Sequence, residues 1–137
     1  MLDGKDVDTQ SFVFLLIDRF SMIAFASAIE PLRIANRMAQ APLYHWRIAT
    51  PDGEPARCSN GTRLVADCGM EDLDKNAMIM VCGGLDIHRA ATPSVMSWLR
   101  KQSRRGVALG AVCTAPFILA KAGLLDNARC TIHWENR

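Results

Sequence analysis

The sequence has no long apolar segment and no excess of charge of either sign. Its longest uncharged apolar run, residues 12–17, is far shorter than the roughly 20 residues that cross a bilayer. The acidic start lacks the basic flank of a signal peptide, so we expect a cytoplasmic protein with no membrane partner. With 16 Lys and Arg residues against 14 Asp and Glu, the formal net charge is +2. The basic residues are scattered except at 100–105, which is not the broad positive surface of a DNA-binding protein.

Metal-ligand and disulfide patterns are also missing. The five cysteines are an odd number, and no two of them have the two-residue spacing of zinc knuckles or dithiol redox sites. His45 and His88 are isolated, with no second ligand nearby in the sequence. We therefore expect free thiols, no metal site and no cofactor. The cysteines are Cys58, Cys68, Cys82, Cys113 and Cys130.

Length and composition are those of one globular domain. At 137 residues, with 50% apolar and 22% charged residues, the chain can bury one core but not two. Residues 1–10 are polar, and we expect them to form a loose N-terminal segment ahead of a single domain at 11–137.

Five stretches rich in apolar and branched residues predict strands. Uninterrupted apolar runs are typical of strands that are buried on both faces of a parallel sheet. The dipeptide Asn60-Gly61 is a strong signal for a hairpin turn and predicts a small peripheral hairpin. The five predicted strands lie at 11–18, 44–50, 77–82, 107–110 and 128–132.

Helices are predicted between these strands. A helix over 21–39 is capped by Ser21 and is expected to kink or restart at Pro31. A second helix begins at Thr92-Pro93, where a cap precedes a proline at the first helical position, and a third covers 115–122. Strands that alternate with helices predict a mostly parallel central sheet with helices on both faces, and a functional site at the carboxyl ends of the strands.

The segment Leu109–Pro116 (LGAVCTAP) places Cys113 between a buried strand and a helix, among small residues. A nucleophile elbow has this arrangement, and the positive end of a helix dipole favours the thiolate. His133 ends the next predicted strand, so the two side chains are a candidate nucleophile and base. The same residues are also compatible with a buried small thiol and a histidine at a strand end.

Longer pieces of the sequence resemble a known family. Cys82-Gly83-Gly84, together with Gly110–Glu135 (GAVCTAPFILAKAGLLDNARCTIHWE), resembles the ThiJ/PfpI branch of the class I glutamine amidotransferase-like superfamily. The helix Phe20–Met38 (FSMIAFASAIEPLRIANRM), the GLLD after the elbow helix and the closing T-x-H-W are similar to the N-terminal sensor domains of GlxA-type AraC-family transcriptional regulators. Within that group the chain most resembles regulators of choline, glycine betaine and carnitine catabolism and related arginine regulators.

The resemblance implies an α/β, flavodoxin-like three-layer sandwich. In the family, further sensor-domain elements and a helix-turn-helix domain follow, so we expect this domain to be C-terminally incomplete and the DNA-binding domain to be absent from this chain. The expected partners are a second copy of the chain in a homodimer, DNA through the missing domain, and a small ligand.

The ligand implied by the resemblance is a small nitrogenous metabolite of the betaine, carnitine or amino-acid class. A quaternary ammonium group prefers an aromatic face, for which Trp134, Phe20 and Trp46 are candidates. The residues expected to line the ligand cleft are Gly83, Gly84, Cys113, Thr114, His133 and Trp134.

Two departures from the enzymes of this superfamily favour binding over catalysis. Those enzymes carry glycine two residues after the cysteine, where this chain has Ala115. They also place an acidic residue near the first strand, where Met22–Phe25 is apolar. We therefore expect a sensor rather than an enzyme. The alternative is a small cysteine-dependent hydrolase, hydratase or glyoxalase-like enzyme with Cys113 as nucleophile and His133 as base.

Overall fold

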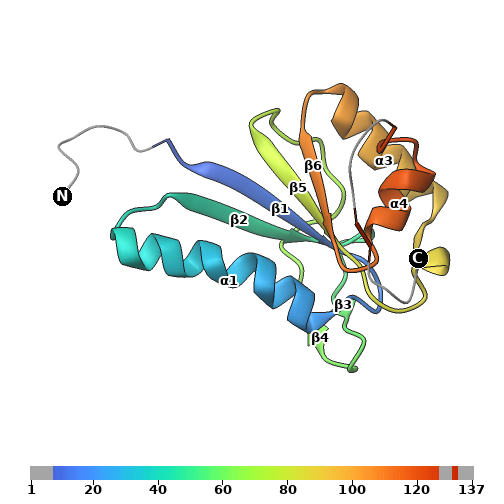
Figure 1. Ribbon diagram of the computed structural model, residues 1–137, viewed down its shortest axis with the longest axis horizontal. Coiled ribbons are helices and arrows are strands. Elements are labelled where there is room, and N and C mark those ends of the chain that lie inside the picture. Colours follow the sequence, from blue (N-terminus) through green and yellow to red (C-terminus); the bar gives the residue numbers. More distant parts are fainter. Residues whose placement is uncertain (1–7, 127–130, 133–137) are drawn as a thin grey trace.

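The computed structural model describes residues 8–126 and 131–132. Its centre is a four-stranded sheet in the order β2-β1-β5-β6, in which all neighbouring strands are parallel (Figure 1). The predicted parallel sheet is confirmed. Of the strand predicted at 128–132, only residues 131 and 132 are described, and they do not form a strand. The four strands are β1 (Gln10–Leu16), β2 (Tyr44–Ala49), β5 (Ala77–Cys82) and β6 (Ala108–Val112).

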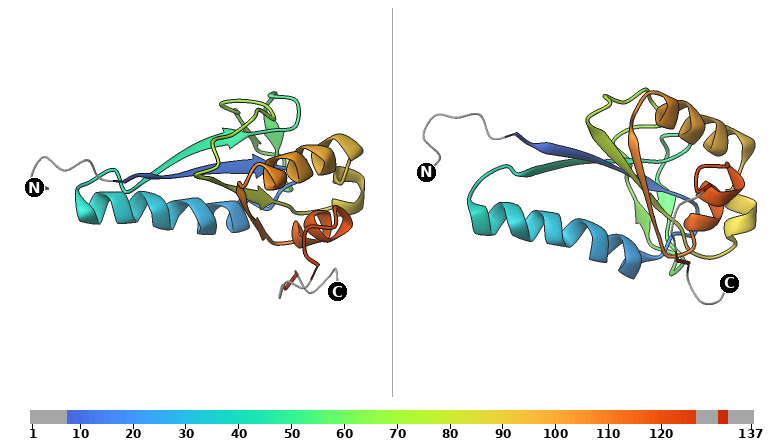
Figure 2. Two further views of the ribbon diagram at one scale, coloured as in Figure 1. Left: turned by 90° about the horizontal axis from the view of Figure 1, so that it is seen from above. Right: turned by 45° about the horizontal axis from the view of Figure 1, so that its top comes forward.

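Helices lie on both sides of this sheet. Figures 1 and 2 show the sheet between α1 and the pair α3 and α4. The three-layer α/β sandwich is therefore confirmed, whereas the one-turn helix α2 was not predicted. The helices are α1 (Met22–Ala39), α2 (Ile87–Ala90), α3 (Pro93–Arg104) and α4 (Pro116–Lys121).

The apolar run in β1 packs on both faces of the sheet, because successive side chains of a strand point to opposite faces. Val13 and Leu15 belong to the core cluster that includes residues of α3 and α4, whereas Phe14 and Leu16 belong to the cluster beneath α1. All four side chains are at most 4% exposed. Each contributes roughly 1.5–3 kcal/mol when buried, so this one strand joins the two halves of the core.

Both long helices begin where the sequence predicts. The Ser21 hydroxyl accepts a hydrogen bond from the backbone N–H of Ala24 at 3.3 Å. The Thr92 hydroxyl accepts one from the backbone N–H of Val95, also at 3.3 Å, and Pro93 occupies the first turn of α3. Each cap satisfies an N–H group that has no partner inside the helix.

Pro31 does not end α1, which continues without interruption to Ala39. The predicted restart at this proline is therefore wrong. Proline cannot donate to the carbonyl four residues earlier, which belongs to Ser27. Ser27 and Pro31 are both exposed, so water can satisfy that carbonyl at little cost to the helix.

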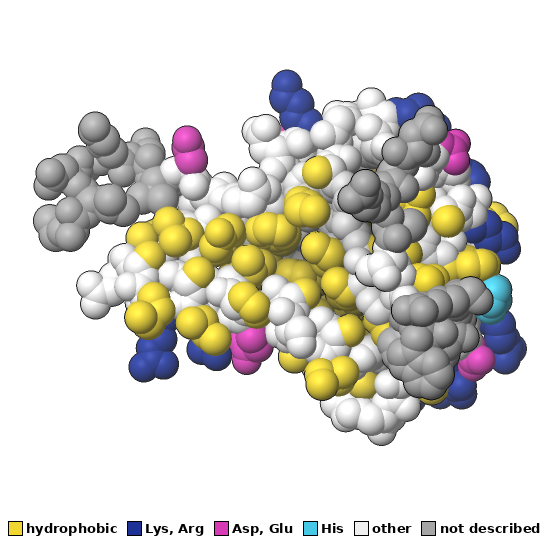
Figure 3. Space-filling model, viewed as in Figure 1, with side chains coloured by type: hydrophobic (Ala, Val, Ile, Leu, Met, Phe, Trp, Pro, Cys, Tyr) yellow, Lys and Arg dark blue, Asp and Glu magenta, His cyan; other side chains and the backbone are white. Residues whose placement is uncertain are grey.

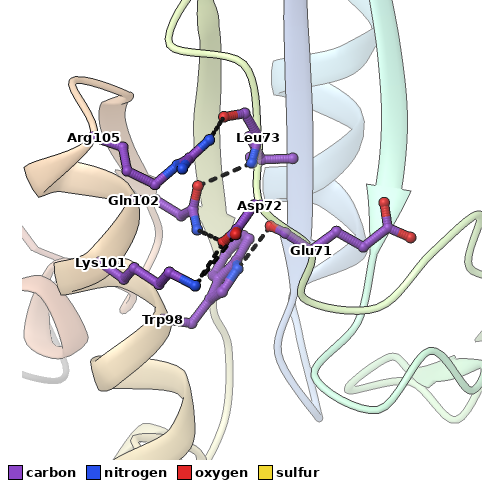
Figure 4. A network of polar contacts seen from close by, with 7 residues as sticks. All are labelled: Glu71, Asp72, Leu73, Trp98, Lys101, Gln102 and Arg105. Atoms are coloured by element: carbon purple, nitrogen blue, oxygen red, sulfur yellow. Dashed lines mark hydrogen bonds and ion pairs between the residues drawn. The ribbon is translucent and has the colours of Figure 1, made fainter.

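A buried glutamine fastens the loop before β5 to α3 (Figure 4). Gln102 is 0% exposed; its side-chain oxygen accepts a hydrogen bond from the Leu73 N–H at 3.0 Å, and its amide donates to Asp72 at 3.0 Å. The Trp98 indole N–H donates to the Glu71 carbonyl at 2.9 Å. These bonds satisfy polar groups in a segment without secondary structure of its own, so α3 fixes the path of the chain into the sheet.

The Asn60-Gly61 turn closes a small antiparallel hairpin, as predicted. Its strands are β3 (Ala56–Arg57) and β4 (Arg63–Leu64). The hairpin packs against the turn between β1 and α1, because the Ser59 N–H donates to the Phe20 carbonyl at 2.8 Å. It therefore stands at the carboxyl end of β1.

Apolar side chains reach the surface on the α1 side of the sheet. Figure 3 shows them gathered along α1 and the neighbouring strands. Phe25 is the one fully buried residue of α1, whereas Ile23 and Met38 are each 79% exposed. In the described residues, no helix is long and apolar enough to cross a membrane.

Candidate functional site at the carboxyl edge of the sheet

Cys113 lies at the sharp turn between β6 and α4. Its backbone φ is +60°, in the left-handed region that non-glycine residues rarely adopt. A nucleophile elbow holds its residue in this strained conformation, so that the side chain projects beyond the end of the strand. The backbone geometry thus agrees with the elbow that the sequence predicts.

Gly83 packs directly beneath this elbow. A Cβ atom placed on Gly83 would lie 2.7 Å from the Thr114 hydroxyl oxygen and 2.8 Å from the Ala115 backbone nitrogen. Real Cβ atoms do not approach other atoms so closely, so only glycine fits there. The helix after the elbow can therefore approach the end of β5 closely, although Ala115 stands where the superfamily enzymes carry glycine.

Gly84 packs against a second turn, the one between β1 and α1. A Cβ atom there would overlap the Arg19 carbonyl oxygen and lie 2.8 Å from the Ser21 nitrogen. Hydrogen bonds tie the same turns together: the Ser21 N–H donates to the Gly83 carbonyl at 2.9 Å, and the Thr114 hydroxyl donates to the Gly84 carbonyl at 2.7 Å. The glycine pair thus allows the turns after β1, β5 and β6 to pack closely together at one edge of the sheet.

Cys113 is the most accessible cysteine of the described residues. It is half-buried, whereas Cys58, Cys68 and Cys82 are buried. Burial, and to a lesser extent the Cys113 thiol, raises the pKa of Cys82 to about 12. Burial also raises the pKa of Cys68. Both buried groups therefore remain neutral thiols at physiological pH and are poor nucleophiles. Cys58 is buried as well, so Cys113 is the reactive candidate among the described cysteines.

The structure brings some of the predicted site residues together. Gly83, Gly84, Cys113 and Thr114 share the carboxyl edge of the sheet, but Thr114 is only 3% exposed and Gly83 is buried. Thr114 contacts both glycines, and Gly84 packs against the β1–α1 turn, so the role of these residues as ligand contacts stays a prediction. The predicted residues His133 and Trp134 lie outside the described residues.

Two aromatic candidates for a cationic ligand pack in or against the core cluster beneath α1. Phe20 is 0% exposed, with its ring 5.9 Å from that of Phe25 in an edge-to-face arrangement. It therefore cannot offer a face to a ligand. Trp46 packs against the core cluster beneath α1.

A cavity that was not predicted opens where β1 and β2 end. Its volume is about 630 Å³, within the range of small-molecule sites. Its walls are the β1–α1 turn, the turn after β2, the β3–β4 hairpin, α2 and the first turn of α3. None of Gly83, Gly84, Cys113 and Thr114 lines it. Because its lining comes from segments that are far apart in the chain, no motif spacing in the sequence could have revealed it.

The chain has a parallel sheet between layers of helices and a cysteine on a strained strand-to-helix turn. These features place it among the flavodoxin-like α/β proteins. The chain belongs to the DJ-1/PfpI family, whose sequence pattern matches residues 10–137. The resemblance noted from the glycine pair and the elbow is confirmed.

Several relatives of the chain are transcriptional regulators. It is 46% identical over 127 residues to the HTH-type transcriptional regulator CdhR of Pseudomonas aeruginosa, covering 93% of this chain and 38% of that protein. It is 38% identical over 135 residues to the HTH-type transcriptional regulator GlxA of Rhizobium meliloti, covering 98% of this chain and 41% of that protein. The chain thus spans about two fifths of the length of these regulators.

A solved structure of a transcriptional regulator also resembles this chain. The AraC family transcriptional regulator from Pseudomonas putida superposes with a TM-score of 0.76 at 30% sequence identity, covering 93% of this chain and 68% of that chain. The predicted similarity to GlxA-type AraC-family regulators is therefore confirmed.

Proposed function

We propose that this chain is the ligand-sensing domain of an AraC-family transcriptional regulator. The observation that carries the proposal is the similarity to CdhR, which extends over 93% of this chain. DNA contacts belong to a helix-turn-helix domain elsewhere in such a regulator, which agrees with the balanced charge of this chain. Two DNA half-sites require two-fold symmetry, so the sensor acts as a homodimer.

The ligand of the sensor is a small nitrogenous metabolite of the betaine, carnitine or amino-acid class. Ligands of open α/β sheets bind beyond the carboxyl ends of the strands. In this chain that edge carries both the elbow at Cys113 and the cavity at the ends of β1 and β2. A ligand can therefore bind at the carboxyl edge of the sheet without being chemically converted.

Calorimetric titration with glycine betaine, carnitine, choline and arginine tests the proposal. We expect saturable binding of at least one of these compounds and a rise in the thermal midpoint at excess ligand, because a ligand that binds only the folded state stabilises it. Binding of none of the four would contradict the proposed sensor. Light scattering measures the homodimer in the same samples, and a monomer at all micromolar concentrations would contradict that part.

A second candidate function is cysteine-dependent catalysis, which the left-handed backbone at Cys113 favours. Against it, Ala115 stands where the enzymes of the superfamily carry glycine, and Phe25, in the stretch where those enzymes place an acidic residue, belongs to a buried apolar cluster. Cys113→Ser separates the two functions, since it preserves shape and polarity. Metabolite binding should survive the change, whereas turnover of amides, isonitriles or α-oxoaldehydes by an enzyme would be lost.

A further inference from the structure

The cavity at the ends of β1 and β2 has an apolar floor and a charged rim. Behind this floor lie the buried Leu16, Ile17 and Val95, and the lining residue Leu85, which is 49% exposed, offers apolar surface to the cavity. Seven charged side chains surround this floor. They are Asp18, Arg19, Asp52, Arg57, Arg63, Asp86 and Arg89.

Two of the four arginines are neutralised by neighbouring carboxylates. Arg19 forms an ion pair with Asp86 at 2.7 Å, and Arg57 forms one with Asp18 at 3.5 Å. The pair between Arg19 and Asp86 also fixes the wall, because it joins the turn after β1 to the turn before α2. Both of its residues hold positive φ angles, +63° and +52°.

The other two arginines are not neutralised. Within the described part of the chain, no carboxylate lies within 4 Å of the guanidinium group of Arg63 or Arg89, and neither side chain makes a hydrogen bond there. They enter the cavity from different walls: Arg63 from β4 and Arg89 from α2. Guanidinium groups bind carboxylates through paired, charge-assisted hydrogen bonds.

The helix behind the cavity adds to the positive potential. Thr92, the cap of α3, lines the cavity, and no acidic residue occupies the first turn of this 12-residue helix. The positive end of its dipole therefore remains uncompensated. Asp52 is the one lining carboxylate without an ion-pair partner, and it accepts a hydrogen bond from the Glu54 N–H at 3.0 Å.

We propose that Arg63 and Arg89 bind the carboxylate of the metabolite that the sensor detects, with the body of the ligand on the apolar floor. The inference rests on the proposed function and assigns its ligand to this cavity. It restricts the ligand class to molecules that carry a carboxylate: glycine betaine, carnitine and arginine fit, whereas choline, which has a hydroxyl group instead, does not.

The test is calorimetric titration of the 137-residue chain and three variants. Arg63→Ala and Arg89→Ala should each weaken the binding of glycine betaine, or of whichever of carnitine and arginine binds, by about tenfold or more, as expected for loss of a hydrogen bond to a charged group. The matched control is Arg37→Ala, since Arg37 is an exposed arginine on α1 outside the cavity lining. This control variant should bind the ligand as tightly as the wild type does. Thermal midpoints within a few degrees of the wild type establish that all variants are folded.

The choice of compounds separates failure of this inference from failure of the proposed function. Binding of choline as tight as that of glycine betaine, or wild-type affinity in both cavity variants, would overturn the carboxylate site while the sensor stands. Tert-butylacetate has a neutral carbon atom in place of the cationic nitrogen of glycine betaine. Its binding therefore measures the contribution of the carboxylate without that of the cationic group. If it binds in an Arg63-dependent manner while no nitrogenous compound binds, the cavity site stands and the proposed ligand class is wrong. If nothing binds, both are wrong.

Discussion

The tight packing of Gly84 predicts that even one added methyl group is strongly destabilising. In Gly84→Ala the new Cβ atom would overlap the Arg19 carbonyl oxygen and lie 2.8 Å from both the Phe20 carbonyl carbon and the Ser21 nitrogen. All three atoms belong to backbone, so no side-chain rotation can relieve the overlap. Either β5 or the β1–α1 turn must shift.

The size of the effect follows from what that shift breaks. Overpacking a well-packed site costs about 1–3 kcal/mol. The shift also breaks the hydrogen bond from the Leu85 N–H to the Arg19 carbonyl at 3.0 Å and the one from the Ser21 N–H to the Gly83 carbonyl at 2.9 Å. Each is worth about 1 kcal/mol. The free energy of unfolding should therefore fall by about 3–5 kcal/mol, a large part of the roughly 5–15 kcal/mol of an ordinary domain.

Urea unfolding followed by circular dichroism measures this loss. With an m-value of about 2 kcal/mol per molar urea, the midpoint should fall by about 2 M. Gly69→Ala is the control, because its Cβ atom would lie 3.5 Å from the Gly53 nitrogen, an ordinary contact, and the change should stay within about 1 kcal/mol. If Gly84→Ala also stays within about 1 kcal/mol of the wild type, the backbone approach is not as close as described.

Three further predictions concern Gln102, Asp72 and the thiols. Gln102→Leu should lower the free energy of unfolding, measured in urea, by about 2–3 kcal/mol, because the buried Leu73 N–H loses its acceptor. The control Lys101→Ala removes an exposed side chain and should cost at most about 1 kcal/mol. Equal losses in the two variants would contradict the larger role of the buried hydrogen bond. Hydrogen bonds from Lys101 and then Gln102 hold the pKa of Asp72 below its usual range, so its stabilisation is present above the unfolded pKa and disappears as the pH falls through the folded pKa. The difference in thermal midpoint between the wild type and Asp72→Asn should therefore be largest near neutral pH and shrink below about pH 4, and a pH-independent difference would refute it. Iodoacetamide at pH 8 should label Cys113 well before Cys82, whose pKa is about 12, as peptide mass mapping can show; equal labelling rates would contradict the burial of Cys82.

Elements with strong local signals could be predicted from the sequence. The uninterrupted apolar run 77–82 coincides with β5, and the cap at Thr92-Pro93 marks the start of α3. Both signals act through neighbouring residues: burial on both faces selects a strand, and a capping hydroxyl followed by proline selects the first turn of a helix. By contrast, α2 has a single turn, and the side chain of its cap residue Asp86 makes no capping hydrogen bond and pairs instead with the distant Arg19, so no local sequence pattern predicts this helix.

The elbow shows how far local information extends into the site. A buried strand, small residues and Pro116 predict a sharp turn at Cys113, and its positive φ agrees with that prediction. The glycine pair predicts a bend after β5, but its reason is tertiary. Gly83 and Gly84 leave room for the elbow and for the β1–α1 turn, which are distant in the chain.

The sequence by itself determined the strands, the long helices and the cysteine at a strand end, because apolar runs, caps and turn residues act over a few neighbouring positions. Only the tertiary structure decided which charges share a cavity. Arg63 on a peripheral hairpin and Arg89 on an unpredicted helix turn both line the space beyond β1 and β2. Both residues line it because β1 and β5 are neighbours in the order β2-β1-β5-β6, and the turn after β1 bridges both the hairpin and the segment after β5. Long-range pairing of strands sets that order, and no local spacing of residues encodes it.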